Sequence, residues 1–246
     1  FGLVWAHVAH TDSHFDPHLL TDFINEYQAV QPLTIGELWA VAISLRLILI
    51  ENLRRIIQRI LAARARRQSA DALADVVLAP VEAGANLFGE FTRRAGNAPG
   101  GPFAVQLVLR LRDHDGNAAD VISWLRAAVE REGGTLDEEA ESEHQRQGSA
   151  NVTVRNIITS MRMATDVSWE NWFDSVSLVD RELRDRSRYG EMDFASRTLY
   201  RNAIEALARD SGRPEIEVAL LVLSLAAAAE PGTRAQPFPL SRTQRD

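Results

Sequence analysis

Three histidines near the N-terminus have the spacing of a metal site. His7, His10 and His14 lie at positions i, i+3 and i+7, which would align three imidazoles on one face of a continuous helix. Such a set of nitrogen ligands suits zinc or iron. The residues from His10 to Ser13 instead favour a helix end, which would scatter the three rings, and zinc ligands normally have carboxylate partners at a fixed spacing. We therefore expect no metal ligand among them.

An Asp-x-Asp pair is the second candidate. Asp113 and Asp115 have the pattern by which many sugar-nucleotide transferases hold a divalent cation. That pattern acts at the end of a buried strand, where both carboxylates reach the metal bound to the diphosphate. Here the pair follows an arginine-rich helix and precedes Gly116. We interpret it as a solvated helix end.

Two runs of like charge could also carry chemistry. The acidic run is Asp137, Glu138, Glu139, Glu141 and Glu143, and the basic run is Arg64, Arg66 and Arg67. General acid–base carboxylates need a pocket that separates their pKa values, whereas acidic residues in the first turns of a helix complement its dipole. We interpret the acidic run as a solvated helix face. The basic run has no interleaved aromatic residue, which argues against nucleic-acid binding.

Arg46 lies inside the apolar stretch 38–50. An unpaired charge in an apolar core is costly, so we expect a carboxylate partner. The candidates are Glu37 or Glu51 on the same segment, and Asp180 or Glu182 from elsewhere. The alternative is that the Arg46 guanidinium binds a phosphate or a sugar. The buried ion pair is the interpretation we favour.

The composition excludes several classes of site. The chain of 246 residues has no cysteine, which excludes disulfide scaffolds, thiolate zinc sites and cysteine nucleophiles. All 27 basic side chains are arginine, so lysine Schiff bases and P-loop lysines are excluded as well. The net charge of −7 is unfavourable for non-specific binding of nucleic acid. The sequence also lacks a glycine-rich phosphate loop, a G-x-S-x-G elbow and an H-E-x-x-H motif.

Helix signals surround all of these residues. Apolar periodicity and capping signals predict helices over 1–9, 17–30, 37–79, 103–113, 117–133, 135–165, 168–184, 193–212 and 214–229. The stretch 37–79 contains no proline or glycine, so it predicts one long helix or two that join near 68–69. The β-branched run 152–154 is too short to predict a strand. We expect an all-α protein, an irregular multi-helix bundle of about eight to ten helices with one long central helix.

The helical segment is expected to cover residues 1–229, with a subdivision near 80–102 as the alternative, and a disordered or atypical tail over 230–246. The apolar runs 38–50 and 218–229 are shorter than the roughly 20 residues of a membrane span. We therefore expect no membrane span in this segment and a soluble isolated chain. The first residue is Phe1 and no signal peptide is apparent, so we expect a fragment or a truncated gene product.

Several blocks follow one another in a fixed order along the chain. They are Gly2–Ser13, Gln31–Ala40 with Glu51–Arg55, Asn151–Arg162, Trp172–Val179, Met192–Phe194, Arg197, Tyr200–Arg201 and Ala203–Glu205. In this order they resemble the N-terminal region of the bacterial cyclic β-1,2-glucan synthases. Together they cover roughly residues 1–225. His14 stands where the family pattern would have arginine, and the pattern is lost from about Ala226 onward.

The resemblance implies a membrane-bound glycosyltransferase that polymerises glucose from UDP-glucose and closes the chain into rings. The matching region would precede the transferase and membrane domains of the same polypeptide, on the cytoplasmic face of the bacterial inner membrane. UDP-glucose and a divalent cation are implied for the parent enzyme, and no cofactor for this segment. The transferase motifs are absent, so we assign no catalytic, cofactor-binding or metal-binding residue.

Two function classes follow from these expectations. The first is a scaffolding or regulatory helical region of a cyclic glucan synthase. The second is a stand-alone helical protein-interaction module without an enzymatic role. No nucleic-acid partner is expected in either case.

Overall fold

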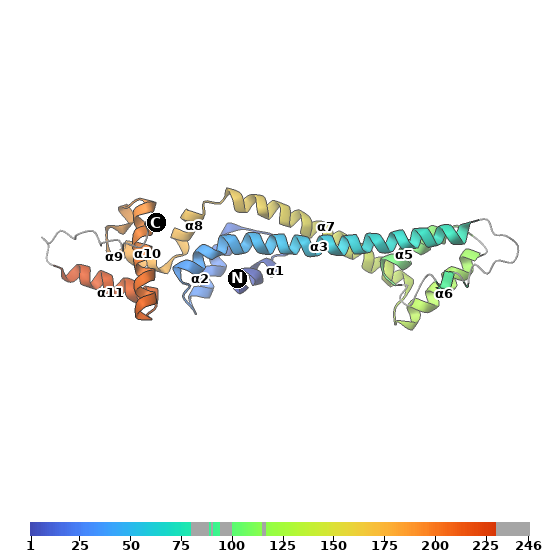
Figure 1. Ribbon diagram of the computed structural model, residues 1–246, viewed down its shortest axis with the longest axis horizontal. Coiled ribbons are helices and arrows are strands. Elements are labelled where there is room, and N and C mark those ends of the chain that lie inside the picture. The colour runs from blue at the N-terminus through green and yellow to red at the C-terminus, as the bar shows by residue number, and fades with distance from the viewer. Residues whose placement is uncertain (80–88, 90, 94–99, 115–116, 230–246) are drawn as a thin grey trace, which may run out of the picture. The chain divides into compact units, whose positions relative to one another are not determined.

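The computed structural model describes residues 1–79, 89, 91–93, 100–114 and 117–229. All regular elements in this part of the chain are helices, and no strand occurs within it (Figure 1). The prediction of an all-α protein is therefore confirmed. The expected tail over 230–246 lies outside the described residues, as does much of the stretch 80–102 where a subdivision was the alternative. In the described ranges, no helix combines the length and the apolar character needed to cross a membrane.

The helices are α1 (Gly2–His10), α2 (Pro17–Gln28), α3 (Ile35–Leu78), α5 (Pro102–Leu111), α6 (Asn117–Arg131), α7 (Leu136–Asp166), α8 (Trp169–Val176), α9 (Leu178–Arg186), α10 (Phe194–Ser211) and α11 (Glu215–Ala228), with a 3₁₀ turn η1 (Arg188–Glu191). The predicted long helix is present as α3, a single helix of 44 residues.

Capping side chains begin several helices where the sequence predicts them. Asp16 accepts hydrogen bonds from the first amides of α2. At the start of α3, the Thr34 amide donates to Glu37 Oε2 (2.9 Å) and the Glu37 amide donates to Thr34 Oγ1 (3.2 Å). Thr135 and Glu138 form the same reciprocal pair before α7. These bonds satisfy amides that the helix itself leaves unpaired.

One predicted helix is wrong. The sequence predicts a continuous helix over 168–184, and the structure has α8 and α9 with a break at Ser177. Ser177 has extended backbone angles (φ −69°, ψ 115°), and its Oγ accepts a hydrogen bond from the Asp180 amide at 3.2 Å. The hydroxyl therefore acts as an N-cap in the middle of the segment, which ends one helix and starts another.

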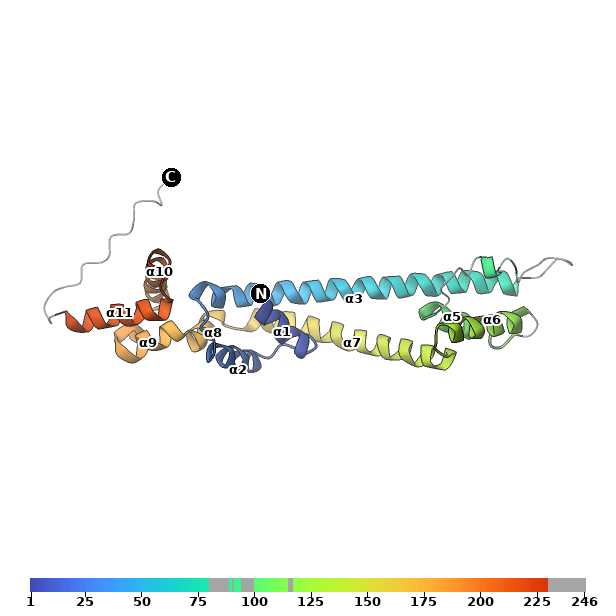
Figure 2. The same cartoon turned by 90° about the horizontal axis from the view of Figure 1, so that it is seen from below.

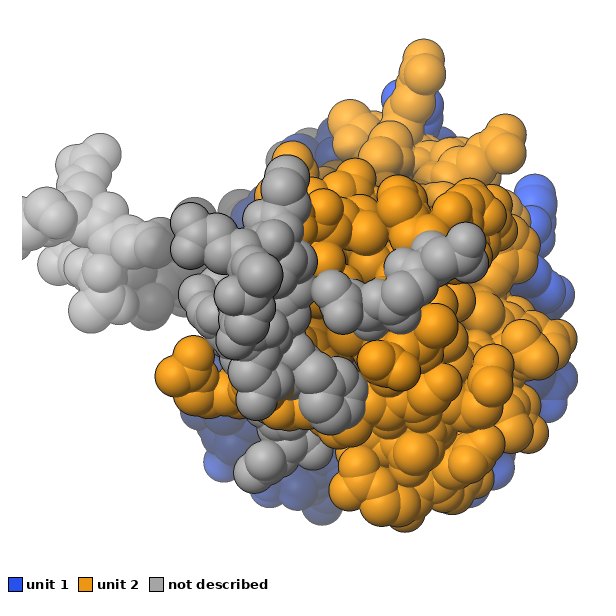
Figure 3. All heavy atoms as spheres, turned by 90° about the vertical axis from the view of Figure 1, so that its right-hand side faces the viewer, with its two compact units in different colours: residues 1, 16–44, 166–246 blue, residues 2–15, 45–165 orange. Residues whose placement is uncertain are grey.

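The chain divides into two compact units, coloured separately in Figure 3. The first unit comprises residue 1 and the ranges 16–44 and 166–246, and the second comprises 2–15 and 45–165. In the first unit, α9 packs against α8, α11 and η1, α10 packs against α11, and α2 packs against α8. Trp39 stacks on Phe173 with ring centroids 4.5 Å apart and meets Phe194 edge-on.

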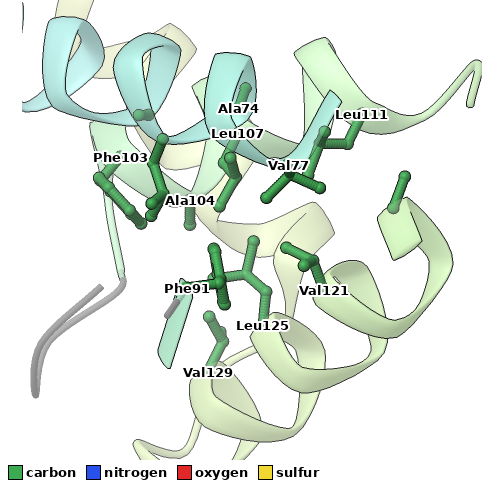
Figure 4. Close-up of a cluster of buried hydrophobic side chains, with 13 residues drawn as sticks. Ala74, Val77, Phe91, Phe103, Ala104, Leu107, Leu111, Val121, Leu125 and Val129 are labelled. Atoms are coloured by element: carbon green, nitrogen blue, oxygen red, sulfur yellow. The ribbon is translucent and has the colours of Figure 1, made fainter. Parts of the chain in front are cut away.

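The second unit has an apolar core at the C-terminal end of α3 (Figure 4). Phe91, Leu107 and Leu125 converge there, and each is fully buried. Ala74 and Val77 close the cluster from α3. These side chains come from α3, α5, α6 and the short helical stretch at 91–93, so burial of this cluster holds the four segments together.

The helices α3 and α7 run antiparallel within the second unit, alongside one another in both ribbon views (Figures 1 and 2). The Arg46 guanidinium donates to the Ala164 carbonyl at one end, and Arg67 pairs with Glu143 at the other. Arg46 and Arg67 are 21 residues apart, as are Glu143 and Ala164. The two contacts therefore belong to one register.

Candidate functional site

The three candidate histidines do not lie on one helix. α1 ends at His10, and Asp12 and Ser13 follow with left-handed backbone angles (φ 48° and 62°). His14 is therefore separated from His7 and His10 by a turn. His7 is buried, whereas His10 and His14 are exposed. Among the residues that the structure describes, no group of three or more histidine or acidic side chains is arranged to hold a metal ion.

The Asp-x-Asp pair lies only partly within the described residues. Asp113 follows the end of α5, with its side chain 80% exposed and one carboxylate oxygen 3.6 Å from Arg112 Nε. Asp115 and Gly116 lie outside the described residues. The described half of the pair is thus at a solvated helix end.

The acidic run at the start of α7 is exposed except at Glu143 and at Glu139, which is half-buried and accepts a hydrogen bond from the Gly101 amide (2.8 Å). Asp137, Glu138 and Glu141 are exposed. Glu143 is only 5% exposed, and its carboxylate accepts hydrogen bonds from Arg67 (2.8 Å) and Gln147 (2.8 Å). Interpreting the whole run as a solvated face was therefore wrong at Glu143, because this side chain is directed between α7 and α3.

The expected buried ion pair of Arg46 is also wrong. Arg46 is exposed and donates to the Ala164 carbonyl at 3.2 Å. Glu51, one of its expected partners, instead accepts hydrogen bonds from Arg54 (2.7 Å) and Arg55 (2.8 Å), which lower the pKa of Glu51 to about 2. Arg46 is exposed despite its apolar sequence neighbours because it lies on the solvent-exposed face of α3.

The turn after α1 is fixed onto α7 by a set of polar contacts. Thr153 Oγ1 donates to the Asp12 carboxylate (2.8 Å), and Asn156 Nδ2 donates to the Asp12 carbonyl (3.1 Å). Buried Ser160 donates to the Ser13 carbonyl (2.7 Å) and accepts from the Phe15 amide (2.8 Å). The three α7 residues lie at i, i+3 and i+7, so one face of α7 holds the turn in its left-handed conformation.

An arginine-lined cleft of about 810 Å³ lies among α1, α3 and α7 in the second unit. Five guanidinium groups line it: those of Arg55, Arg59, Arg66, Arg67 and Arg146. Two carboxylates, Asp12 and Glu143, also line it. Two members of the predicted basic run therefore belong to this cleft. Its volume is in the range of small-molecule sites.

A buried ionic cluster occupies the first unit and was missed by the sequence analysis. Arg201, fully buried on α10, forms a fork with the Asp180 carboxylate: Nε lies 3.1 Å from both oxygens and Nη2 lies 2.5 Å from Oδ2. Nη2 also donates to Asp174. The guanidinium stacks between the rings of Phe173 and Phe194, 4.7 and 5.0 Å from their centroids. This geometry is that of a bidentate, desolvated ion pair.

Three further side chains complete the ionic cluster. Arg197 pairs with Asp174 at 2.8 Å, and Arg184 lies 3.5 Å from Asp174 and 3.8 Å from Asp180. Tyr189 Oη donates to Asp180 Oδ1 at 2.7 Å. Each carboxylate is therefore shared among several donors.

The pKa values in the cluster follow from burial and pairing. Burial, together with the hydrogen bond to the Asp180 carboxylate, raises the pKa of Tyr189 well above its ordinary value. Burial alone would lower the pKa of Arg201, but the hydrogen bonds to Asp180 and the charges of Asp180 and Asp174 raise it. Both groups therefore stay protonated at neutral pH, as expected of a structural ion-pair network.

No protein-family model matches the chain. It is 39% identical over 226 residues to the cyclic β-(1,2)-glucan synthase NdvB of Rhizobium meliloti. The match covers 91% of this chain but only 8% of that synthase. The resemblance drawn from the sequence blocks is therefore confirmed, for a segment that spans less than a tenth of the length of its relative.

Proposed function

Since the chain is related over nine-tenths of its length to a segment of the cyclic β-(1,2)-glucan synthase family, we propose that it is a helical scaffolding or regulatory part of such an enzyme. The identity of 39% with NdvB carries this proposal. In the proposal, the chain supports a glycosyltransferase that polymerises and cyclises glucose from UDP-glucose. UDP-glucose and the divalent cation bind elsewhere in that enzyme.

An exposed apolar stripe on α3 supports a role in contacting another protein segment. Leu47, Ile50, Ile57 and Leu61 are 54%, 50%, 45% and 56% exposed. Positions 47, 50, 54, 57 and 61 are separated by alternating steps of three and four residues, as in a helix–helix seam. Four of these positions are apolar, and the remaining one, position 54, is arginine. A stripe of this kind on a soluble helix typically marks an interaction surface. The rest of the synthase polypeptide is the occupant we propose.

The proposed setting is the cytoplasmic face of the bacterial inner membrane, next to the transferase and membrane domains of one polypeptide. The alternative is a stand-alone helical interaction module that shares ancestry with the synthases but takes no part in their reaction. The same stripe would then bind an unrelated partner. The two proposals differ in whether glucan synthesis depends on this chain.

Complementation separates the two proposals. A synthase that lacks the region matching this chain is supplied with the chain as a separate polypeptide, and cyclic glucan is measured. We expect synthesis to be restored. The double variant Leu47→Glu/Ile57→Glu should fold, as judged by far-ultraviolet circular dichroism, yet restore little.

The matched control is Leu109→Glu, which changes an equally exposed leucine on α5 and should restore synthesis as the unchanged chain does. No restoration by the unchanged chain would favour the stand-alone module. Full restoration of glucan synthesis by the double variant would show that the α3 stripe is not the contact surface.

The isolated chain should not turn over UDP-glucose with magnesium or manganese. The reason is that Asp113 lies at a solvated helix end and not beside a strand. A radiolabelled UDP-glucose assay measures this. Turnover that is lost in Asp113→Asn would contradict the proposal that the chemistry lies elsewhere.

A further inference from the structure

The cleft of the second unit concentrates positive charge in a chain that is acidic overall. Five guanidinium groups and two carboxylates line it, so positive charge predominates among the lining side chains. The whole chain has a net charge of −7. A local surplus of this sign raises the concentration of anions near the cleft.

The arginines that line the cleft differ in how closely they pair with carboxylates. Arg67 is held by buried Glu143 at 2.8 Å. Arg146 lies farther from its acidic neighbours, 3.5 Å from Glu143 and 3.8 Å from Glu139, and its side chain is 57% exposed. Within the described part of the chain, Arg59 forms no ion pair with a carboxylate. Arg59 and Arg146 are therefore the groups most available to a ligand.

Neutral donors and an apolar wall complete the cleft. Asn52 on α3 and Asn151 on α7 line it, and Asn52 Nδ2 also donates to Ser13 Oγ at 3.2 Å. Ile56 and Ile60 form an apolar wall on α3. The cleft thus offers guanidinium forks and amide groups beside an apolar surface, which is the usual make-up of a site for a charged small molecule.

We propose that this cleft binds a multiply charged phosphorylated anion of the diphosphate class. A guanidinium presents paired N–H groups that match two oxygens of a phosphate group. The two guanidinium groups that carboxylates engage least, one on α3 and one on α7, suit the two phosphate groups of a diphosphate. Arg59 from α3 and Arg146 from α7 are the principal ligands, and Asn52 and Asn151 contact the group esterified to the phosphates. This site is independent of the role proposed for the α3 stripe.

Titration calorimetry of the full 246-residue chain with inorganic pyrophosphate tests the proposal. We expect saturable binding that weakens as salt is added, because exposed charges are screened. Arg59→Gln and Arg146→Gln should each weaken binding by about tenfold or more, the loss of one charge-assisted contact. Arg155→Gln is the matched control, since it removes an exposed arginine on α7 outside the cleft, and it should bind as the unchanged chain does.

Two further arms identify the ligand class. Sulfate at equal ionic strength should not compete, which separates diphosphate recognition from general anion attraction. Vesicles of phosphatidylcholine with and without phosphatidylglycerol report binding to a lipid surface. The proposal would be overturned if the chain bound no pyrophosphate, whether or not it bound the phosphatidylglycerol vesicles. It would also be overturned if Arg59→Gln and Arg146→Gln bound pyrophosphate as tightly as the unchanged chain. Circular dichroism melts of each variant show whether it is folded.

Discussion

Arg46 and Arg201 differ in burial in a way that their sequence neighbours do not indicate. Arg46 has apolar neighbours along the chain yet is exposed, because Leu45, Ile48 and Leu49 take the buried positions of that turn of α3. Arg201 has a mixed neighbourhood along the chain, between Tyr200 and Asn202, yet is fully buried. Its burial depends on α8, α9 and η1, which lie at some distance in the sequence. Sequence neighbours therefore do not decide which charge is buried.

Arg201→Ala should destabilise the chain by about 3–5 kcal/mol, because Asp180 would remain buried without its main counter-ion. Urea unfolding followed by circular dichroism measures the change. Arg188→Ala is the control: Arg188 also pairs with a carboxylate, that of Glu191, but both side chains are largely exposed, so the cost should stay below about 1 kcal/mol. Equal midpoints for both variants would contradict the assignment of Arg201 as the centre of the buried cluster.

Arg46→Ala should cost no more than about 1.5 kcal/mol. The lost interaction is one hydrogen bond to the Ala164 carbonyl, made by an exposed guanidinium, and such bonds contribute about 0.5–1.5 kcal/mol net. The same urea experiment measures it. A loss as large as that of Arg201→Ala would show that Arg46 is paired inside the protein.

At the scale of the element, capping signals predicted most helix ends, and one such signal was missed. The pairs Thr34 with Glu37 and Thr135 with Glu138 are local, so a stretch of four residues contains all the information needed. Ser177 and Asp180 have the same spacing, but they lie within a run that is apolar on both sides and looks continuous. The turn at Asp12 and Ser13 could not be predicted in detail, because side chains about 140 residues away hold it. The arginine-lined cleft could not be predicted either, because its lining residues come from segments far apart in the sequence.

Ser160→Ala should loosen the turn after α1 from α7 and destabilise the chain by about 2–3 kcal/mol. The substitution leaves the Ser13 carbonyl and the Phe15 amide without their buried partner, and each unsatisfied buried group costs about 1–3 kcal/mol. Hydrogen exchange of the Phe15 amide, with the urea midpoint, measures both effects. The control is Ser142→Ala, an exposed serine on the same helix, which should change neither. Unchanged exchange at Phe15 in Ser160→Ala would refute the assignment.

At the scale of the whole molecule, stability should fall as the pH rises above about 10. Tyr189 has a raised pKa in the folded chain, whereas an unfolded tyrosine titrates near 10. Below about pH 10 the Tyr189 phenol is protonated in both states, and its full contribution to the free energy of unfolding is present. Above that pH the folded chain binds more protons than the unfolded chain, so the free energy of unfolding decreases as the pH rises. Urea midpoints at a series of alkaline pH values measure the slope. Tyr189→Phe should be less stable near neutral pH but lose less on alkalinisation, and an unchanged slope would count against the Tyr189–Asp180 hydrogen bond.

The antiparallel register of α3 and α7 limits how this protein can change in length. Arg46 faces Ala164 and Arg67 faces Glu143, with 21 residues between the contacts on each helix. One codon inserted into either stretch would turn the following residues by about 100° and advance them by about 1.5 Å, so one of the two contacts would be lost. A longer version of this pair keeps both contacts only if both helices gain matched insertions of whole heptads.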